Sequence, residues 1–335
     1  MKKVLRFAVT TTALVLFGIG SATARADCET DEVITIANMT WSSAATLAHI
    51  EARILQAGYD CQTQLVPGDT VPTATTMASK GQPHIAPEFW MANAEEIVRK
   101  GVESGMIDIA GEVVQGGSTQ GWWIPKYLSE AYPDLKSVHD LPRYKHLFPD
   151  ASDPEKGRIY NCPPGWGCEI VNTNLFKAYG LGSSYVNYSP GSGAALDATI
   201  ASAYKRKKPW LGYYWGPSSI LGKYDMVRLE TNPHDPVLDA CNREAECQNP
   251  HAGGFNSSQV NTLVTSTLKD GAPSVYTFLS KVSFDPAVYN ELLAWGDDNK
   301  AEPAEVADHF LKHYPHLWQG WVSDEAAEKL KANLL

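Results

Sequence analysis

Short apolar segments alternate with helical patterns through the first third of the chain, and this alternation is its strongest constraint on the fold. The segments expected to be strands are 33–37, 62–66 and 84–89, and the expected helices cover 43–57, 73–80 and 92–104. Strict alternation of strands and helices along the chain predicts an α/β fold with parallel strands and right-handed crossovers. Ligands of such folds bind at the carboxyl ends of the strands, where Trp41 and Trp90 stand.

The middle of the chain has a different composition from the segments on either side. Residues 119–253 are rich in Gly, Pro, Tyr and Trp, and residues 272–333 are helical in pattern. Strands in the middle part are expected at 121–124, 158–161 and 210–215, and helices at 173–179 and 194–205. The Pro- and Gly-containing segment 249–254 is expected to cross back between two lobes.

The N-terminus has the features of a secretory signal peptide. A basic start with Lys2, Lys3 and Arg6 is followed by an apolar stretch over 7–20 and by a small-residue cleavage site at 24–26. We therefore expect residues 1–26 to be removed and the protein to be periplasmic. Asp27 before Cys28 argues against a lipid anchor, and no run of 18 apolar residues predicts membrane insertion.

Charge and cysteine content limit the partners. The formal net charge of −10 argues against nucleic acid, whose phosphates require basic surface. The six cysteines allow 15 pairings, and proximity along the chain favours three disulfides: Cys162–Cys168, Cys241–Cys247 and Cys28–Cys61. No Cys-x-x-Cys occurs, so we expect no metal site.

Four of the ten tryptophans lie at strand ends or in tight loops instead of on amphipathic helices. These residues are Trp41, Trp90, Trp166 and Trp215. Several indole faces together suit a quaternary ammonium ion, which has no N–H to donate and attracts the faces of aromatic rings. Sugars also stack on Trp, so the tryptophans alone leave the ligand open.

The segment Cys162-Pro-Pro-Gly-Trp-Gly-Cys168 narrows the choice. A disulfide across it would stiffen the loop and preorganise the amides of Gly167 and Cys168 for an anion. Indole faces for a cation beside amides for a carboxylate describe a site for a zwitterion such as a betaine.

At these motifs the sequence resembles the periplasmic substrate-binding proteins of glycine betaine/proline betaine ABC transporters and their choline-, carnitine- and trimethylamine N-oxide-binding relatives. The disulfide-closed Trp loop, the run ending in Trp90 and the segment 213–217 carry the resemblance. It implies that Trp90, Trp166 and Trp215 form the cage, that Gly167 and Cys168 bind the carboxylate, and that a membrane permease is the partner.

The same resemblance implies the architecture. It is a two-lobed binding protein of the type II kind, with mixed sheets flanked by helices and a hinge between the lobes. Lobe 1 would comprise 29–118 plus 254–335, and lobe 2 would comprise 119–253. We expect a monomer without a cofactor.

Two departures from the family pattern bear on the ligand. Some glycine betaine binders have a His where this chain has Ala94, with Asn93 beside it, so carboxylate recognition is expected to be weaker. Trp41 and Trp122 could add a fourth wall, which suits choline or trimethylamine N-oxide. Glu88 is interpreted as a solvated acid at a strand end, with a role facing the ligand as the alternative.

A secreted carbohydrate-binding protein or glycosidase is the alternative function. A glycosidase needs two carboxylates beside the site, and the Trp loops supply only Glu88 and Glu169. Neither a Gly-x-Ser-x-Gly nor a His-Glu-x-x-His motif occurs, so an enzyme is not predicted.

Overall fold

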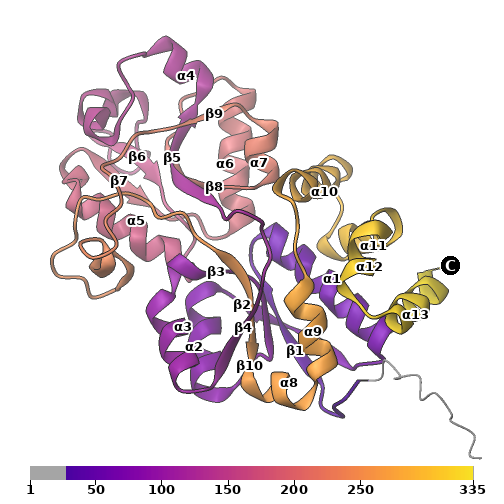
Figure 1. The fold of residues 1–335 in the computed structure, drawn as a ribbon. Coiled ribbons are helices and arrows are strands. Elements are labelled where there is room, and N and C mark those ends of the chain that lie inside the picture. Colours follow the sequence, from indigo (N-terminus) through magenta and orange to yellow (C-terminus); the bar gives the residue numbers. More distant parts are fainter. Residues whose placement is uncertain (1–27, 335) are drawn as a thin grey trace, which may run out of the picture.

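The computed structural model describes residues 28–334, which form two lobes, each built on a five-stranded mixed sheet (Figure 1). The strands of the first sheet are β1 (Ile34–Met39), β2 (Thr63–Gly68), β3 (Ile85–Trp90), β4 (Ile107–Glu112) and β10 (Val260–Thr265). The strands of the second sheet are β5 (Thr119–Pro125), β6 (Gly157–Tyr160), β7 (Tyr185–Tyr188), β8 (Gly212–Gly216) and β9 (Met226–Arg228). The expected two-lobed α/β architecture is thereby confirmed.

The two sheets share one strand arrangement. The first runs in the order β2-β1-β3-β10-β4 and the second in the order β7-β6-β8-β5-β9. In each sheet the first three strands are parallel, and the strand in the fourth position is antiparallel to them. This fourth strand is β10 in the first sheet and β5 in the second. The strands expected from the sequence correspond to β1, β2, β3, β5, β6 and β8, whereas β4, β7, β9 and β10 were not expected.

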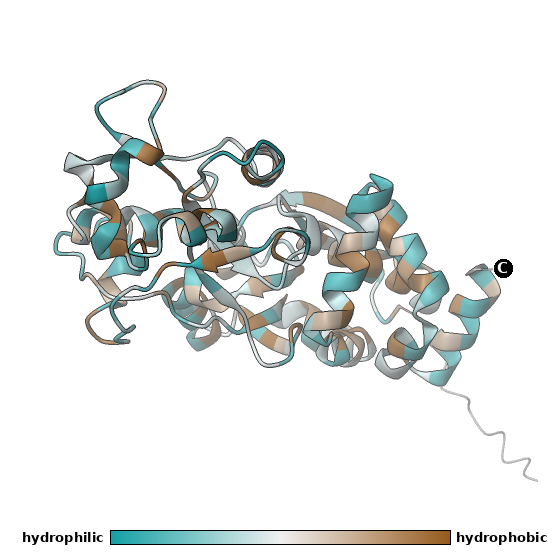
Figure 2. Ribbon diagram, turned by 90° about the horizontal axis from the view of Figure 1, so that it is seen from above, coloured by the Kyte–Doolittle hydropathy of each residue, from teal (hydrophilic) through white to brown (hydrophobic). Residues whose placement is uncertain are grey.

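Helices cover both sheets and follow the expected amphipathic pattern, with alternating hydrophilic and hydrophobic positions (Figure 2). Lobe 1 contains α1 (Ser42–Tyr59), α2 (Thr70–Lys80), η1 (Met91–Asn93) and α3 (Glu95–Glu103). Lobe 2 contains α4 (Lys126–Ala131), η2 (Val138–Leu147), α5 (Gly167–Ala178), η3 (Leu181–Ser183), α6 (Gly193–Lys205), α7 (Ser219–Lys223) and η4 (Ala240–Arg243). In α1, Leu47, Ile50 and Ile54 are completely buried, which fixes this helix against the first sheet.

The C-terminal part is helical, as expected, and packs mainly on lobe 1. It comprises α8 (Ser266–Gly271), α9 (Pro273–Lys281), α10 (Pro286–Asn299), α11 (Pro303–His313), α12 (Pro315–Trp321) and α13 (Asp324–Leu334). Helix α10 also reaches lobe 2, because the Nζ of Lys223 in α7 lies 2.7 Å from Asp298 and 3.3 Å from Asp297.

The chain passes between the lobes twice, and the two crossing segments bond to each other. The Ser118 amide and hydroxyl both donate to the Ser258 carbonyl, at 3.1 and 2.8 Å. The Gln120 side chain donates to the Asn256 carbonyl at 2.9 Å. These short, paired segments are where a hinge between the lobes would lie.

All three expected disulfides are present. They join Cys28 to Cys61, Cys162 to Cys168 and Cys241 to Cys247. Proximity along the chain therefore selected the right pairing among the possible ones. The expected signal peptide lies outside the described residues.

Candidate functional site

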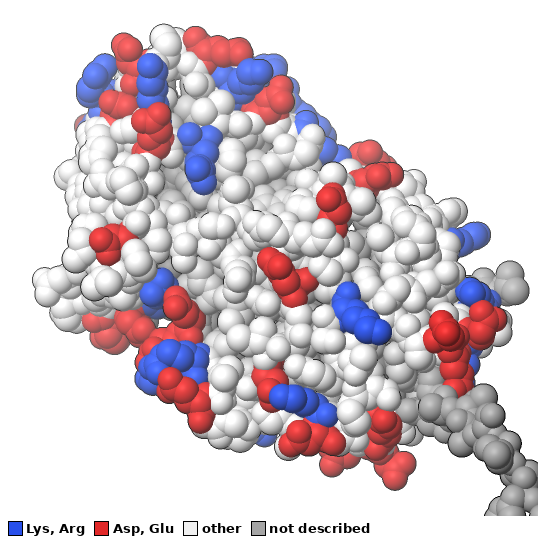
Figure 3. All heavy atoms as spheres, in the orientation of Figure 1, with Lys and Arg blue, Asp and Glu red and all other residues white. Residues whose placement is uncertain are grey.

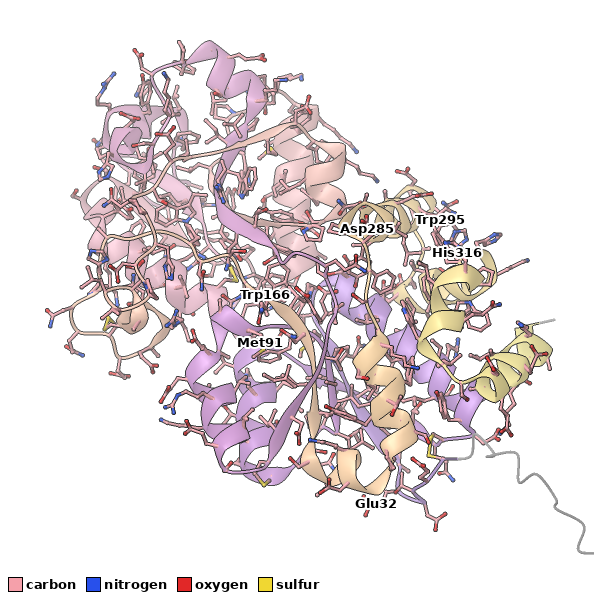
Figure 4. All side chains as sticks on the ribbon, in the orientation of Figure 1. Glu32, Met91, Trp166, Asp285, Trp295 and His316 are labelled. Carbon is pink, nitrogen blue, oxygen red and sulfur yellow. A yellow bond between two sulfur atoms is a disulfide. The ribbon has the colours of Figure 1, made fainter. Side chains whose placement is uncertain are left out.

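Four indole rings, two from each lobe, meet at the junction of the lobes, where Figure 4 labels Trp166. The ring centroids of Trp166 lie 5.3 Å from those of both Trp41 and Trp215, and Trp90 lies 6.3 Å from Trp215. The three pairs have interplanar angles between 74° and 81°. Because neighbouring rings are close to perpendicular, they form walls of a box instead of a stack.

Secondary structure explains why these four rings converge. Trp41 is the N-cap of α1 after β1, and Trp90 ends β3, so both stand at carboxyl ends of parallel strands. Trp166 is the N-cap of α5, and Trp215 lies near the end of β8. The structure thus brings together four tryptophans singled out from the sequence.

All four rings line one small pocket at the junction of the lobes. Its other lining residues are Thr70, Asn93, Cys168 and Tyr213, so the lining carries no charged side chain. Sequence reasoning missed Thr70 and Tyr213. Nothing in the local sequence marks Thr70, whereas Tyr213 lies two residues before Trp215, the spacing that puts two side chains on one face of a strand.

The amides of Gly167 and Cys168 belong to the first turn of α5. Such amides have no partner inside a helix, and the helix dipole places partial positive charge there. Neither amide has an acceptor among residues 28–334. Together with the Cys168 contribution to the cavity lining, this geometry suits an anionic or oxygen-bearing end of a ligand.

Asn93 approaches the start of α5 from the other lobe. A Cβ placed on Gly167 would lie 2.1 Å from the Asn93 carbonyl oxygen, so only glycine permits this approach. The contact joins η1 of lobe 1 to α5 of lobe 2 beside the cavity.

Trp166 also makes hydrogen bonds across the junction. Its Nε1 donates to Thr40 Oγ1 at 2.7 Å and to Asp69 Oδ1 at 3.1 Å, both in lobe 1. The Val71 amide donates to the Gly165 carbonyl at 3.3 Å. The two lobes are therefore in direct contact around the cage, in a closed arrangement.

Glu88 is not the solvated strand-end acid that the sequence suggested. It is 1% exposed, and its Oε1 accepts from Trp41 Nε1 at 2.8 Å, Ser43 Oγ at 2.6 Å and Trp90 Nε1 at 3.4 Å. Its Oε2 accepts from the Tyr289 hydroxyl. The strand-end position is real, but the N-terminus of α1 and helix α10 cover it, so the carboxyl group lies behind the indoles instead of in solvent.

The ionisation of Glu88 reflects two opposing effects. Burial raises the pKa of its carboxyl group, and the hydrogen bonds from Ser43, Tyr289, Trp41 and Trp90 lower it in part, so that the pKa stays above its ordinary value.

Trp122 does not form a fourth wall. Its ring packs against Phe255 at 5.5 Å and Tyr179 at 6.1 Å, is 1% exposed and is absent from the cavity lining. The reason is that the returning crossing segment brings Phe255 over it. Trp41, by contrast, does line the cavity.

Other kinds of site are not evident among residues 28–334. They contain no cluster of three or more His, Cys, Asp or Glu side chains arranged to hold a metal ion. Within the same residues no helix is both long enough and apolar enough to cross a bilayer. On the face shown in Figure 3, Lys and Arg lie scattered among Asp and Glu, without the continuous basic patch that nucleic acid requires.

The fold and the aromatic cavity between the lobes define a two-lobed substrate-binding protein. The chain matches the family described as the substrate binding domain of ABC-type glycine betaine transport systems over residues 32–313. It belongs to this family, which serves transport and is not a family of enzymes.

Individual relatives agree with this assignment. The glycine betaine/proline betaine-binding periplasmic protein of Salmonella typhimurium is 25% identical over 225 residues, covering 64% of this chain and 67% of the relative. The glycine betaine-binding periplasmic protein of Dickeya dadantii is 36% identical over 107 residues, 31% of each chain. Among solved structures, an ABC-transporter choline-binding protein in complex with choline superimposes with a TM-score of 0.71 at 19% identity, covering 92% of this chain and 99% of that one.

Proposed function

We propose that this protein binds a compact trimethylated onium compound in the tryptophan cage and delivers it to the permease of an ABC importer. The candidate ligands are choline, glycine betaine, carnitine and trimethylamine N-oxide. The observation that carries the proposal is the set of four near-perpendicular indoles, contributed by both lobes, around a cavity lined without charged side chains.

The physical basis is the chemistry of a methylated cation. Its methyl groups carry the spread positive charge and need apolar contact, and indole faces provide both attraction and contact. A desolvated cation–π contact contributes about 2 kcal/mol, so three or four give about 6–8 kcal/mol before ordering costs. A micromolar Kd corresponds to about −8 kcal/mol, so methyl burial and polar contacts must contribute as well.

The polar end of the ligand would lie against the first turn of α5. The free amides of Gly167 and Cys168 are the donors, with Asn93 and Thr70 at the same cavity. Because no cationic side chain lines the cavity, a carboxylate has only these neutral donors. The cage therefore also accepts ligands with a hydroxyl or N-oxide oxygen, and it selects a carboxylate less strongly than a site with a cationic side chain would.

Closure of the lobes completes the site. We place lobe 1 at 29–118 plus 254–335 and lobe 2 at 119–253, so Trp41 and Trp90 come from one lobe and Trp166 and Trp215 from the other. A ligand that contacts both halves favours the closed state. Export to the periplasm after removal of residues 1–26, action as a monomer, and release to a permease follow from this role.

Calorimetric titration with a ligand panel tests the proposal. Choline, glycine betaine, carnitine and trimethylamine N-oxide are each titrated into the purified mature chain, with proline and maltose as controls. At least one trimethylated compound should bind in the micromolar range and shift tryptophan fluorescence, and the controls should not. Binding of a sugar with no response to any onium compound would replace the proposal by the carbohydrate-binding alternative.

A further inference from the structure

The Glu88 carboxyl group accepts hydrogen bonds from four neutral donors and, among the described residues, has no cationic partner. Trp41, Ser43, Trp90 and Tyr289 all direct an N–H or O–H at its two oxygens. An ionised carboxylate is acceptor-only and has room for about four such bonds, so the charged form accommodates all four donors. Among the described residues no Lys, Arg or His forms an ion pair with Glu88.

A buried carboxylate without a counter-ion is energetically costly, and proteins normally pair such groups. Here the nearest place for a positive charge is the cavity. The two indoles bonded to Glu88 through their N–H edges, Trp41 and Trp90, present the same rings to the cavity. An anion on the N–H of an indole also pushes electron density into the ring, which strengthens the attraction of its face for a cation.

Asp69 is the other acid near the cage. It accepts from Trp166 Nε1 at 3.1 Å but is only partly buried at the rim. Solvent screens a charge in that position more than one that is 1% exposed. Glu88 is therefore the acid whose negative charge would stabilise a bound cation most.

We propose that Glu88 is the counter-ion of the cage: it fixes the two lobe-1 indoles and supplies the negative charge that makes the box select cations over neutral molecules of the same shape. This inference rests on the proposed function. Glu88 does not line the cavity, so it acts on the ligand through Trp41 and Trp90 as a positioning residue.

Glu88→Gln separates the charge from the geometry. The glutamine oxygen can still accept from Trp41, Ser43 and Trp90. Its amide can donate to the Tyr289 hydroxyl, because that hydroxyl can turn to the Ser43 carbonyl, 2.9 Å away. The hydrogen-bond network is thus retained while the charge is lost.

The matched control is Glu51→Gln. Glu51 in α1 is likewise a completely buried glutamate, has no hydrogen-bond partner among the described residues, and lies close enough to raise the pKa of Tyr289. Burial raises the pKa of Glu51 well above its ordinary value, so Glu51→Gln changes a buried, uncharged acid without touching a cage indole and controls for the substitution itself.

The measurement is the Kd of choline against that of its uncharged carbon isostere, 3,3-dimethylbutan-1-ol, in each variant. For Glu88→Gln we expect choline to bind at least about tenfold more weakly, as for unit charges up to about 12 Å apart in a protein of intermediate dielectric. The isostere should stay within about twofold, and Glu51→Gln should change neither. Equal weakening of both ligands, or of neither, would overturn the charge role; failure of the wild type to bind any onium compound would instead overturn the proposed function.

The wild type gives a second readout that needs no variant. Burial raises the pKa of Glu88, and a bound cation favours its ionised form, so choline affinity is full above that raised pKa and falls as the pH drops through it. The other titratable groups facing this region are Tyr289 on α10, Glu51 on α1 and Asp69 at the rim. A pH dependence that is equally large for the isostere, or that survives in Glu88→Gln, would contradict the proposal.

Discussion

Replacing Trp166 with phenylalanine or with alanine separates two contributions of this ring to ligand binding. Its face is a wall of the cage, and its Nε1 bonds Thr40 at 2.7 Å and Asp69 at 3.1 Å across the lobe junction. Phenylalanine keeps an aromatic face and loses the N–H, whereas alanine loses both.

The magnitudes follow from these contacts. A hydrogen bond to a charged group contributes about 1.5–3 kcal/mol, and the low end applies because water satisfies the indole when the lobes are apart. Trp166→Phe should therefore weaken binding about tenfold. Trp166→Ala also loses a cation–π contact of about 2 kcal/mol, which brings the expected loss to roughly 400-fold.

Titration calorimetry with the tightest onium ligand measures both losses. Trp210→Phe is the matched control, since Trp210 is buried in lobe 2, donates to Thr199 at 2.9 Å and does not line the cavity. Its affinity should equal that of the wild type. If Trp166→Phe bound as tightly as the wild type, the indole N–H would have no part in closure; if Trp166→Ala did so, the cage itself would be refuted.

Two further predictions concern the polar end of the cavity. Gly167→Ala should weaken the binding of every ligand by at least about tenfold without lowering the melting temperature of the ligand-free protein. The reason is that a Cβ would lie 2.1 Å from the Asn93 carbonyl only when the lobes close. Unchanged affinity in calorimetry would mean that this contact is absent from the bound state. Replacing both Cys162 and Cys168 with serine should weaken glycine betaine more than choline, because the disulfide stiffens the turn whose amides face a carboxylate. Parallel titrations of the two ligands check this, and an equal loss would show that the turn does not select the carboxylate.

Local sequence pattern was sufficient for every parallel strand except β7. The runs that became β1, β3 and β8 are apolar, short and followed by turn residues, so their carboxyl ends, and the tryptophans there, could be located in advance. Strand β10 could not be found in this way. It pairs with β3 and β4 from more than 140 residues further along the chain, so nothing local determines its place.

The site residues were predictable where a ring stands at a strand end. They were not predictable where tertiary packing determines whether a side chain is buried and what covers it. Glu88 was misjudged because a strand-end acid is usually solvated, and only the arrival of Tyr289 from α10 encloses it. A local signal existed, since Glu88 is the one polar residue in the six-residue strand Ile85–Trp90, whose other side chains are apolar. Trp122 was misplaced because its covering residue, Phe255, lies beyond the whole second lobe in sequence.

The insertion of β10 between β3 and β4 has a consequence for the order in which the polypeptide can acquire its structure. β4 has no other neighbour in its sheet, so it stays unpaired until residues 260–265 have been made. The second sheet, by contrast, draws its strands from one uninterrupted stretch, residues 119–228. During N-to-C synthesis all the strands of lobe 2 are therefore made before the last strand of lobe 1. Until β10 is made, the edge of β3 that it will pair with stays unpaired.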